Sequence, residues 1–234
     1  MGFVMFRSRL KRWFFRLSFT RFTNILIQAH YRRGMRILDV GCGNNSAVKT
    51  KVAFPDCEYH GIDCCNYNNA EGAMAAIDKF YLMDLTNLDF RCIPDAYFDV
   101  VVMSHVIEHL KNGDEVIKAL IPKLKPGGVI YIEYPAPRTA EYPKQARHLN
   151  FYDDPTHVRV FCRRELREIL ENEHLKIIKA KTRKNLIRIL LTPLLLLYSR
   201  FIRDGYFSGT VLIDITGFAE YIVARRPLMM EGAN

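Results

Sequence analysis

The sequence predicts an α/β fold with a doubly wound, mostly parallel, seven-stranded sheet. Short apolar runs alternate with segments of helical pattern, which is the order that a parallel sheet requires. The first run ends in an acid and two closely spaced glycines, and the second ends in another acid, as in doubly wound sheets. The length of 234 residues suits one compact domain with additional segments.

The predicted strands and helices follow from these runs. Strands are expected at 36–40, 58–62, 80–83, 97–103, 128–133, 175–181 and 218–224. Helices are expected at 45–53, 67–78, 113–124 and 163–172. The Lys-Pro-Gly-Gly segment at 125–128 is expected to end the third helix and turn the chain into the fifth strand.

Three regions are predicted along the chain. Residues 1–33 form a basic amphipathic helix, 34–228 form the main domain, and 229–234 form a tail. The main domain contains a long polar loop at 134–162 and an apolar helical insertion at 185–208. The apolar run of that insertion is about half the roughly 20 residues that a membrane-spanning helix needs. We therefore expect it to lie at a membrane interface or over the core.

Charge and cysteine content narrow the class of protein. Residues 1–36 carry nine basic side chains and no acid, whereas the remaining chain has as many acids as bases. The six cysteines form no Cys-x-x-Cys pair, which argues against a zinc ribbon or a disulfide framework. We expect a cytoplasmic protein with a basic arm on a neutral body.

The arm is also rich in phenylalanine, which leaves several interpretations open. Rings on one side of a helix and arginines elsewhere suit the inner face of an anionic membrane. A helix that covers a ligand cleft is the second interpretation. A nucleic-acid arm is the weaker alternative, and a signal peptide fits poorly because arginines interrupt every apolar stretch.

The segment from Asp39 to Gly43 and two later acids predict a nucleoside site. Gly41 and Gly43 let the backbone turn sharply and approach a ligand. Asp63 ends the second strand, where a carboxylate accepts hydrogen bonds from ribose hydroxyls, and Asp84 ends the third, within reach of an adenine amine. Ser46 replaces the third glycine of a pyrophosphate-binding turn. A nucleoside without phosphates therefore fits better than a dinucleotide.

These residues, with the segments at 98–110 and 124–128, resemble class I S-adenosylmethionine-dependent methyltransferases over residues 35–135. The resemblance implies a Rossmann-like methyltransferase fold and S-adenosylmethionine as cofactor. It also implies that the glycine turn holds the methionine portion, the second-strand acid the ribose, and the third-strand acid the adenine. The cofactor-binding residues so assigned are Asp39, Gly41, Cys42, Gly43, Asp63, Asp84, Leu85 and Ser104.

The segment at 148–159 resembles one in bacterial methyltransferases associated with surface-polysaccharide and glycolipid genes. This resemblance implies a sugar or glycolipid acceptor. Asn150 and Arg159 are the candidates for binding it, the arginine through an anionic group.

His105-Val106-Ile107-Glu108-His109 matches the inverted zinc-protease signature, but its context does not. That motif belongs on a long helix, whereas here it follows a buried strand. We therefore expect no metal in this region.

Transfer of a sulfonium methyl group depends mainly on alignment in a dry cleft. A sugar hydroxyl would also need a base, for which His157 and His105 are the candidates. The leading hypothesis is O-methylation of a sugar, glycolipid or other small-molecule acceptor at the cytoplasmic membrane surface, with no nucleic-acid partner. Methylation of a lipid or quinone precursor and a non-catalytic cofactor-binding subunit are the alternatives, and Ser46 disfavours a dehydrogenase.

Overall fold

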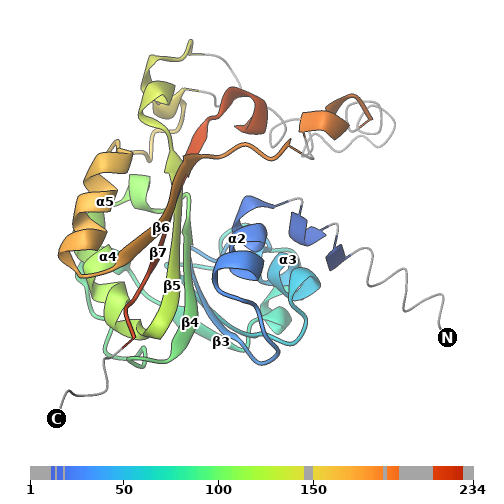
Figure 1. Ribbon diagram of the computed structural model, residues 1–234, viewed down its shortest axis with the longest axis vertical. Helices are drawn as coiled ribbons and strands as arrows, with labels where there is room; N and C mark the ends of the chain where they lie inside the picture. The colour runs from blue at the N-terminus through green and yellow to red at the C-terminus, as the bar shows by residue number, and fades with distance from the viewer. Residues whose placement is uncertain are drawn as a thin grey trace.

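The computed structural model describes residues 12–13, 15–17, 19–144, 150–186, 189–194 and 213–228. Their centre is a seven-stranded sheet of order β3-β2-β1-β4-β5-β7-β6 (Figure 1). The strands are β1 (Arg36–Val40), β2 (Glu58–Asp63), β3 (Lys79–Leu82), β4 (Phe98–Ser104), β5 (Leu124–Pro135), β6 (Lys176–Thr182) and β7 (Ala219–Arg225). β7 is antiparallel to both of its neighbours, and the pairs from β3 to β5 are parallel. The predicted fold class is confirmed.

The order of strands reverses between β1 and β4, and this reversal positions the site. Leu38 of β1 pairs with His60 of β2 on one side and with Val101 of β4 on the other. The chain leaves β1 toward β2 and leaves β4 toward β5, so the loops after these two strands diverge. In an open α/β sheet, the crevice between such loops is where ligands bind.

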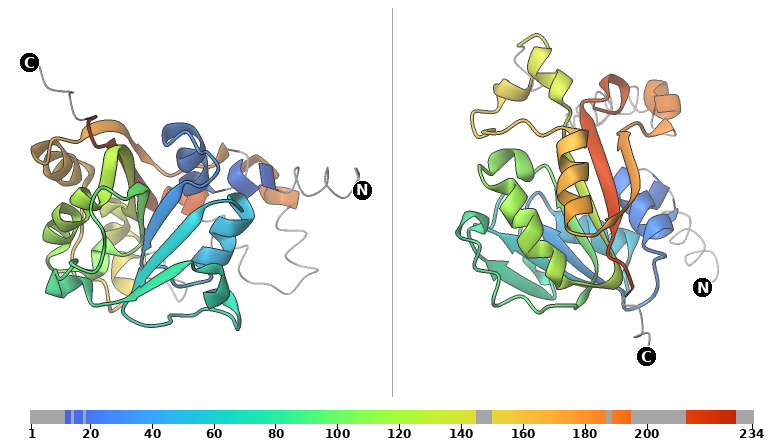
Figure 2. Two further views of the ribbon diagram at one scale, coloured as in Figure 1. Left: turned by 90° about the horizontal axis from the view of Figure 1, so that it is seen from below. Right: turned by 60° about the vertical axis from the view of Figure 1, so that its left-hand side comes forward.

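Helices cover both faces of the sheet. α2 (Thr20–Gln28) and α3 (Ser46–Ala53) lie on one face, and α4 (Gly113–Leu120) and α5 (Arg163–Asn172) on the other (Figures 1 and 2). Each face has its own apolar core, because successive strand residues point to opposite sides. Leu38 packs with the core beneath α4 and α5, and Ile37 with the core beneath α2 and α3.

The prediction of a helix at 67–78 is wrong. The structure has only a short 3₁₀ helix there, η1 (Ala73–Ala76), which Gly72 precedes with a φ of +77°. Asparagines upstream bind other groups: the Asn69 Oδ1 atom accepts the Asn45 N–H, and the Asn68 amide donates to Asn44. Such local polar bonds compete with helix formation.

Two further boundaries differ from those predicted. β5 begins at Leu124, so the Lys-Pro-Gly-Gly segment belongs to the strand, where the β4–β5 register shifts between Phe98 and Val100. The arm is not one helix to residue 33, because Phe19 is extended and α2 begins after it.

The later part of the arm packs onto the domain. Phe22 of α2 is fully buried and contacts Phe54 edge to face. α2 is therefore a core-covering helix, whereas residues 1–11, most of the insertion (187–188 and 195–208) and the tail lie outside the described residues. None of the described helices is long and apolar enough to cross a membrane.

Candidate active site

The turn after β1 requires glycine at two positions. Gly41 has a φ of +73°, and a Cβ there would lie 2.3 Å from Cγ2 of Val106. A Cβ on Gly43 would lie 2.6 Å from the carbonyl oxygen of Tyr67. The turn is tied to β2, since the N–H groups of Gly41 and Cys42 both donate to the Ile62 carbonyl. A side chain at either position would collide with the neighbouring loops, so only glycine fits this turn, which lines the crevice.

Asp63 lies directly beside this turn, as predicted. Its Oδ2 atom accepts the Gly43 N–H at 3.0 Å, and its Oδ1 atom accepts the Cys64 N–H at 2.9 Å. Each carboxylate oxygen has a second lone pair, so the side chain keeps the capacity to bind two hydroxyls.

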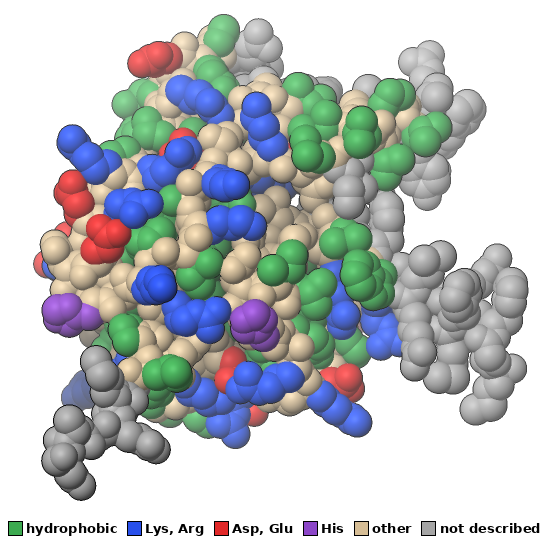
Figure 3. All heavy atoms as spheres, in the orientation of Figure 1, with side chains coloured by type: hydrophobic (Ala, Val, Ile, Leu, Met, Phe, Trp, Pro, Cys, Tyr) green, Lys and Arg blue, Asp and Glu red, His purple; other side chains and the backbone are tan. Residues whose placement is uncertain are grey.

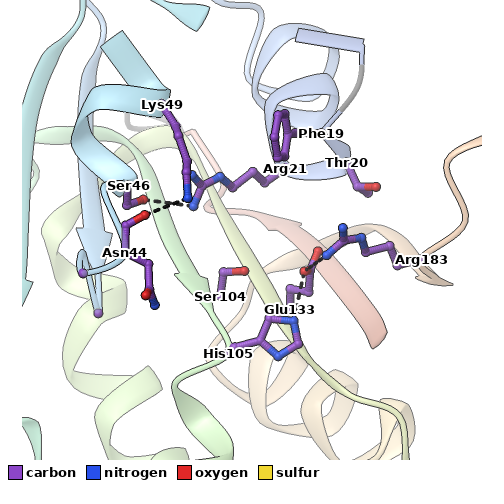
Figure 4. A pocket seen from close by; sticks show the side chains of 12 residues that line it. Phe19, Thr20, Arg21, Asn44, Ser46, Lys49, Ser104, His105, Glu133 and Arg183 are labelled. Atoms are coloured by element: carbon purple, nitrogen blue, oxygen red, sulfur yellow. Dashed lines mark hydrogen bonds and ion pairs between the residues drawn. The ribbon is translucent and has the colours of Figure 1, made fainter. Parts of the chain in front are cut away.

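A cavity of about 600 Å³ opens beside the turn. Of the predicted residues, those that line it are Gly41, Gly43, Asp63, Ser104, His105, Asn150 and His157. A smaller cavity of about 220 Å³ continues from Ser104 and His105 toward Arg21, Glu133 and Arg183 (Figure 4). The loops that follow β1 and β4 thus form one continuous site, since both cavities are lined by Gly41, Gly43, Ser104 and His105.

Asp39 and Cys42 support the turn from behind and line neither cavity. The Asp39 Oδ2 atom accepts hydrogen bonds from Ser46 Oγ at 2.5 Å and from the Tyr59 hydroxyl at 2.6 Å. Burial raises the pKa of the Asp39 carboxyl, while Arg21, Ser46 and Tyr59 act in the opposite direction. Burial also raises the pKa of the Cys42 thiol to about 12, which makes it an inert packing group.

Asp84 and Leu85 do not line either cavity. The Asp84 carboxylate caps η2 (Leu85–Asn87) by accepting the Thr86 N–H at 2.9 Å, and Leu85 is buried in the core. Their contact with an adenine therefore stays a prediction.

Arg159 and Asn150 are held by the protein itself. The Arg159 guanidinium pairs with Asp114 at 2.8 Å and with Glu165 at 2.6 Å, away from both cavities. Its charge is therefore already neutralised, which does not fit the predicted role in binding an anionic acceptor. The Asn150 side chain caps η6 (Phe151–Asp153), and its amide donates to the Tyr142 carbonyl. Asn150 forms part of the cavity wall with its polar groups largely used.

The structure corrects the predicted role of His105 as a base. Its ring lies between two carboxylates, with Nδ1 3.1 Å from Glu108 and Nε2 3.2 Å from Glu133. Desolvation disfavours the charged ring, but the hydrogen bonds to both glutamates outweigh it and raise the pKa of His105 to about 9. An imidazole that donates from both nitrogens is protonated at neutral pH and accepts no proton.

His157 keeps an available nitrogen. Its Nδ1 atom is 2.7 Å from the Phe151 carbonyl oxygen, which only accepts, so the ring proton lies on Nδ1. Nε2 lies 4.0 Å from Oε1 of Glu108 and 3.9 Å from Oδ2 of Asp154, beyond hydrogen-bond distance, and the residue lines the larger cavity.

The sequence analysis missed the buried charges of the smaller cavity. The Glu133 carboxylate lies 2.7 Å from Arg183 and accepts the Tyr131 hydroxyl, and Arg183 also pairs with Asp214 at 3.1 Å. Burial disfavours the Glu133 carboxylate, but Arg183 and His105 outweigh it and hold the pKa of Glu133 well below its usual range. A lone acid within the apolar run of β5 was the available signal, because a strand buried on both faces rarely carries an unpaired charge.

The cavity and its polar groups fit an adenosyl amino acid. Pockets for ligands of that size span roughly 300–1,000 Å³. The glycine turn lines the cavity, and Asp63 beside it supplies a carboxylate for a ribose.

Comparison with known proteins agrees with this geometry. The chain is 28% identical over 101 residues to a ubiquinone biosynthesis O-methyltransferase of Idiomarina loihiensis, covering 42% of this chain and 41% of that protein. It is 32% identical over 145 residues to a probable S-adenosylmethionine-dependent methyltransferase of Mycolicibacterium smegmatis, covering 61% and 52%. The chain thus spans about half the length of these relatives.

Solved structures share the fold. A SAM-dependent methyltransferase from Archaeoglobus fulgidus matches with a TM-score of 0.55 and 20% identity, over 95% of this chain and 99% of that one. A phosphoethanolamine N-methyltransferase from Haemonchus contortus in complex with S-adenosyl-L-methionine matches with a TM-score of 0.56 and 17% identity, over 88% and 52%. The sequence model of a methyltransferase-domain family matches residues 9–180, well over half of the chain. The protein therefore belongs to this methyltransferase-domain family.

Proposed function

We propose that this enzyme methylates a hydroxyl oxygen of a small amphiphilic acceptor, such as a sugar, a glycolipid or another small molecule, at a membrane surface. The mixed wall of the larger cavity supports this most directly. Ile213 and Phe218 provide an apolar side, while Thr156 and His157 provide a polar side. A partly apolar molecule with a hydroxyl group matches both.

The residues of the site have separate tasks in this proposal. The bound cofactor supplies a methyl group activated on a sulfonium. Asp63 and the glycine turn bind the nucleoside and methionine portions, and Nε2 of His157 accepts the proton of the acceptor hydroxyl. The protonated His105 and its two glutamates form a fixed polar wall that positions the acceptor.

A quinone or lipid precursor is the second candidate acceptor. Several curated relatives are named ubiquinone biosynthesis O-methyltransferases, whose name specifies O-methylation. Such an acceptor would also suit the apolar side of the cavity.

Exposed leucines support the membrane part of the proposal. Leu186, Leu190 and Leu194 are 69%, 79% and 64% exposed, and their spacing of four places them on one side of a helix. Figure 3 shows apolar side chains gathered over this part of the surface. Leucines on one side of a surface helix suit the interfacial layer of a bilayer.

Product analysis with methyl-labelled S-adenosylmethionine tests the acceptor class. Purified enzyme is incubated with polyphenol, free-sugar and glycolipid acceptors, and labelled products are identified by mass spectrometry. We expect a methyl ether on one class, and no product with Asp63→Ala. Label on nitrogen or carbon only would contradict the proposal.

A further inference from the structure

Three potential metal ligands gather on the wall of the larger cavity. Glu108, His109 and His157 each offer one ligand atom, and these atoms lie within 4.8 Å of one another. All three residues line the cavity that also contains Gly41 and Asp63. The cluster therefore lies within the reaction site but is separate from the groups that hold the nucleoside.

The fold fixes this arrangement. Glu108 and His109 belong to η3 (Ile107–His109), directly after β4, whereas His157 comes from the long loop. That loop is bonded to Glu108, since the N–H groups of Val158 and Arg159 donate to the Glu108 carbonyl at 2.9 and 3.2 Å. The two parts of the cluster are thus held together by backbone, independently of any ligand.

The Glu108 carboxylate is incompletely satisfied. The residue is 1% exposed, and its Oε1 atom lies 3.1 Å from Nδ1 of His105. Its buried Oε2 atom makes no hydrogen bond within the part of the chain that the structure describes. Leaving a buried polar atom unpaired carries a free-energy penalty, which is larger for a charged group. A cation beside Oε2 would remove this penalty.

Both histidines use Nδ1 in hydrogen bonds, which leaves Nε2 to bind an ion. His157 donates its ring proton from Nδ1 to the Phe151 carbonyl. The Thr156 hydroxyl donates to Asp154 at 2.5 Å, so at 2.9 Å it accepts a hydrogen bond from Nδ1 of His109. Metal-ligating histidines commonly donate their other N–H in this way, which fixes the ring and frees the ligating nitrogen.

We propose that Glu108, His109 and His157 bind a divalent transition-metal ion of the Zn²⁺ or Mn²⁺ class. Two imidazoles and one carboxylate suit these ions and leave open coordination positions. Mg²⁺ and Ca²⁺ prefer oxygen ligands and bind such a set weakly. Ligands of a tetrahedral ion are about 3.4 Å apart, so side-chain rotations that move the ligand atoms by about 1 Å complete the site.

The role of the ion rests on the proposed hydroxyl acceptor, although its binding does not. An ion in the cavity wall would bind the acceptor oxygen and lower the pKa of its hydroxyl. The proton then leaves to water, and His157 serves as a ligand in place of accepting it. The ion would thereby make a general base unnecessary, which matters because His105 is protonated and cannot act as one.

Manganese binding tests the site without any acceptor. Apo enzyme is titrated with Mn²⁺ and the free ion is measured by electron paramagnetic resonance, with Zn²⁺ as competitor. We expect one site per chain, displaced by Zn²⁺, with affinity at least 10-fold weaker in both His157→Ala and His109→Ala. The outer-shell variant Thr156→Val should weaken binding less than either ligand variant.

Cys65→Ser is the matched control, because Asp63, Cys64 and Cys65 form the other candidate cluster in the described residues. It should bind Mn²⁺ like the wild type. Absence of a stoichiometric site, or an affinity for Mn²⁺ in both histidine variants equal to that of the wild type, would overturn the metal proposal. Each variant is also titrated with S-adenosylmethionine. A variant that binds the cofactor but not the metal is folded, so its loss of metal binding is not caused by misfolding. If the metal-bound enzyme transfers no methyl group, the proposed hydroxyl acceptor is wrong, whereas the metal site is still supported.

Discussion

Gly41 and Gly34 have nearly the same backbone conformation but different surroundings. Their φ angles are +73° and +74°, yet a Cβ on Gly34 would meet no atom within 4 Å. Gly34→Ala therefore isolates the backbone strain, which costs about 1–2 kcal/mol. Gly41→Ala adds the collision with Val106, and overpacking of that kind costs about 1–3 kcal/mol more. Urea denaturation of both variants should show this difference in the free energy of unfolding, and equal values would contradict it.

Arg183 and Glu133 form a deeply buried ion pair of the site. Arg183→Met removes one partner and leaves a buried charge, which we expect to destabilise the protein by about 3–5 kcal/mol at pH 7. Arg91→Met, on an exposed pair with Asp89, should leave the unfolding free energy unchanged.

The same pair predicts how this difference depends on pH. The pKa of Glu133 is lowered in the folded protein, so its contribution is complete above its ordinary value of 4.5 and is lost as the pH falls below it. Without Arg183, burial is opposed by fewer groups, so the pKa of Glu133 is higher in the variant than in the wild type and protonation relieves its buried charge. The difference in unfolding free energy between wild type and Arg183→Met should therefore become smaller from pH 7 to pH 4. A difference that does not change with pH would refute this account.

At the scale of elements, the strands were predictable because burial and alternation leave a strong pattern. All seven were located within a few residues, and β1 (Arg36–Val40) exactly. The helix prediction at 67–78 failed because the asparagines of this segment bond to the neighbouring turn, a tertiary effect that periodicity does not report.

Among site residues, the glycine turn and Asp63 belong to local sequence motifs and could be predicted. Arg183 joins Glu133 from 50 positions away, so only the folded chain brings them together.

The helical segment that carries Leu190 offers a test of membrane contact at this same scale. Leu190→Glu replaces a side chain that is 79% exposed, so folding should be unaffected. Burying a leucine contributes about 1.5–3 kcal/mol, so binding to anionic liposomes should fall about 10-fold or more in a flotation assay. Leu82→Glu, at a position 68% exposed at the end of β3, is the control and should float like the wild type. Equal loss in both variants would show a general charge effect.

At the scale of the whole molecule, cofactor binding should stabilise the fold because both loops of the crevice contribute to one cavity. At 100 times its Kd, a ligand of the native state adds about 2.7 kcal/mol. For a domain of this size, S-adenosylmethionine should therefore raise Tm by about 5–10 °C in differential scanning calorimetry. Asp63→Ala should abolish the rise, and Asp89→Ala, far from the cavity, should keep it.

NAD is the discriminating ligand in the same experiment. A pyrophosphate needs a helix N-terminus reached through a third glycine. Here that position is Ser46, which is 5% exposed and whose hydroxyl is bound to Asp39 and Arg21. The start of α3 is thus closed by its own side chains, and NAD at the same concentration should leave Tm unchanged. A rise equal to that given by S-adenosylmethionine would mean that the turn accepts phosphates after all, and the nucleoside assignment would fail.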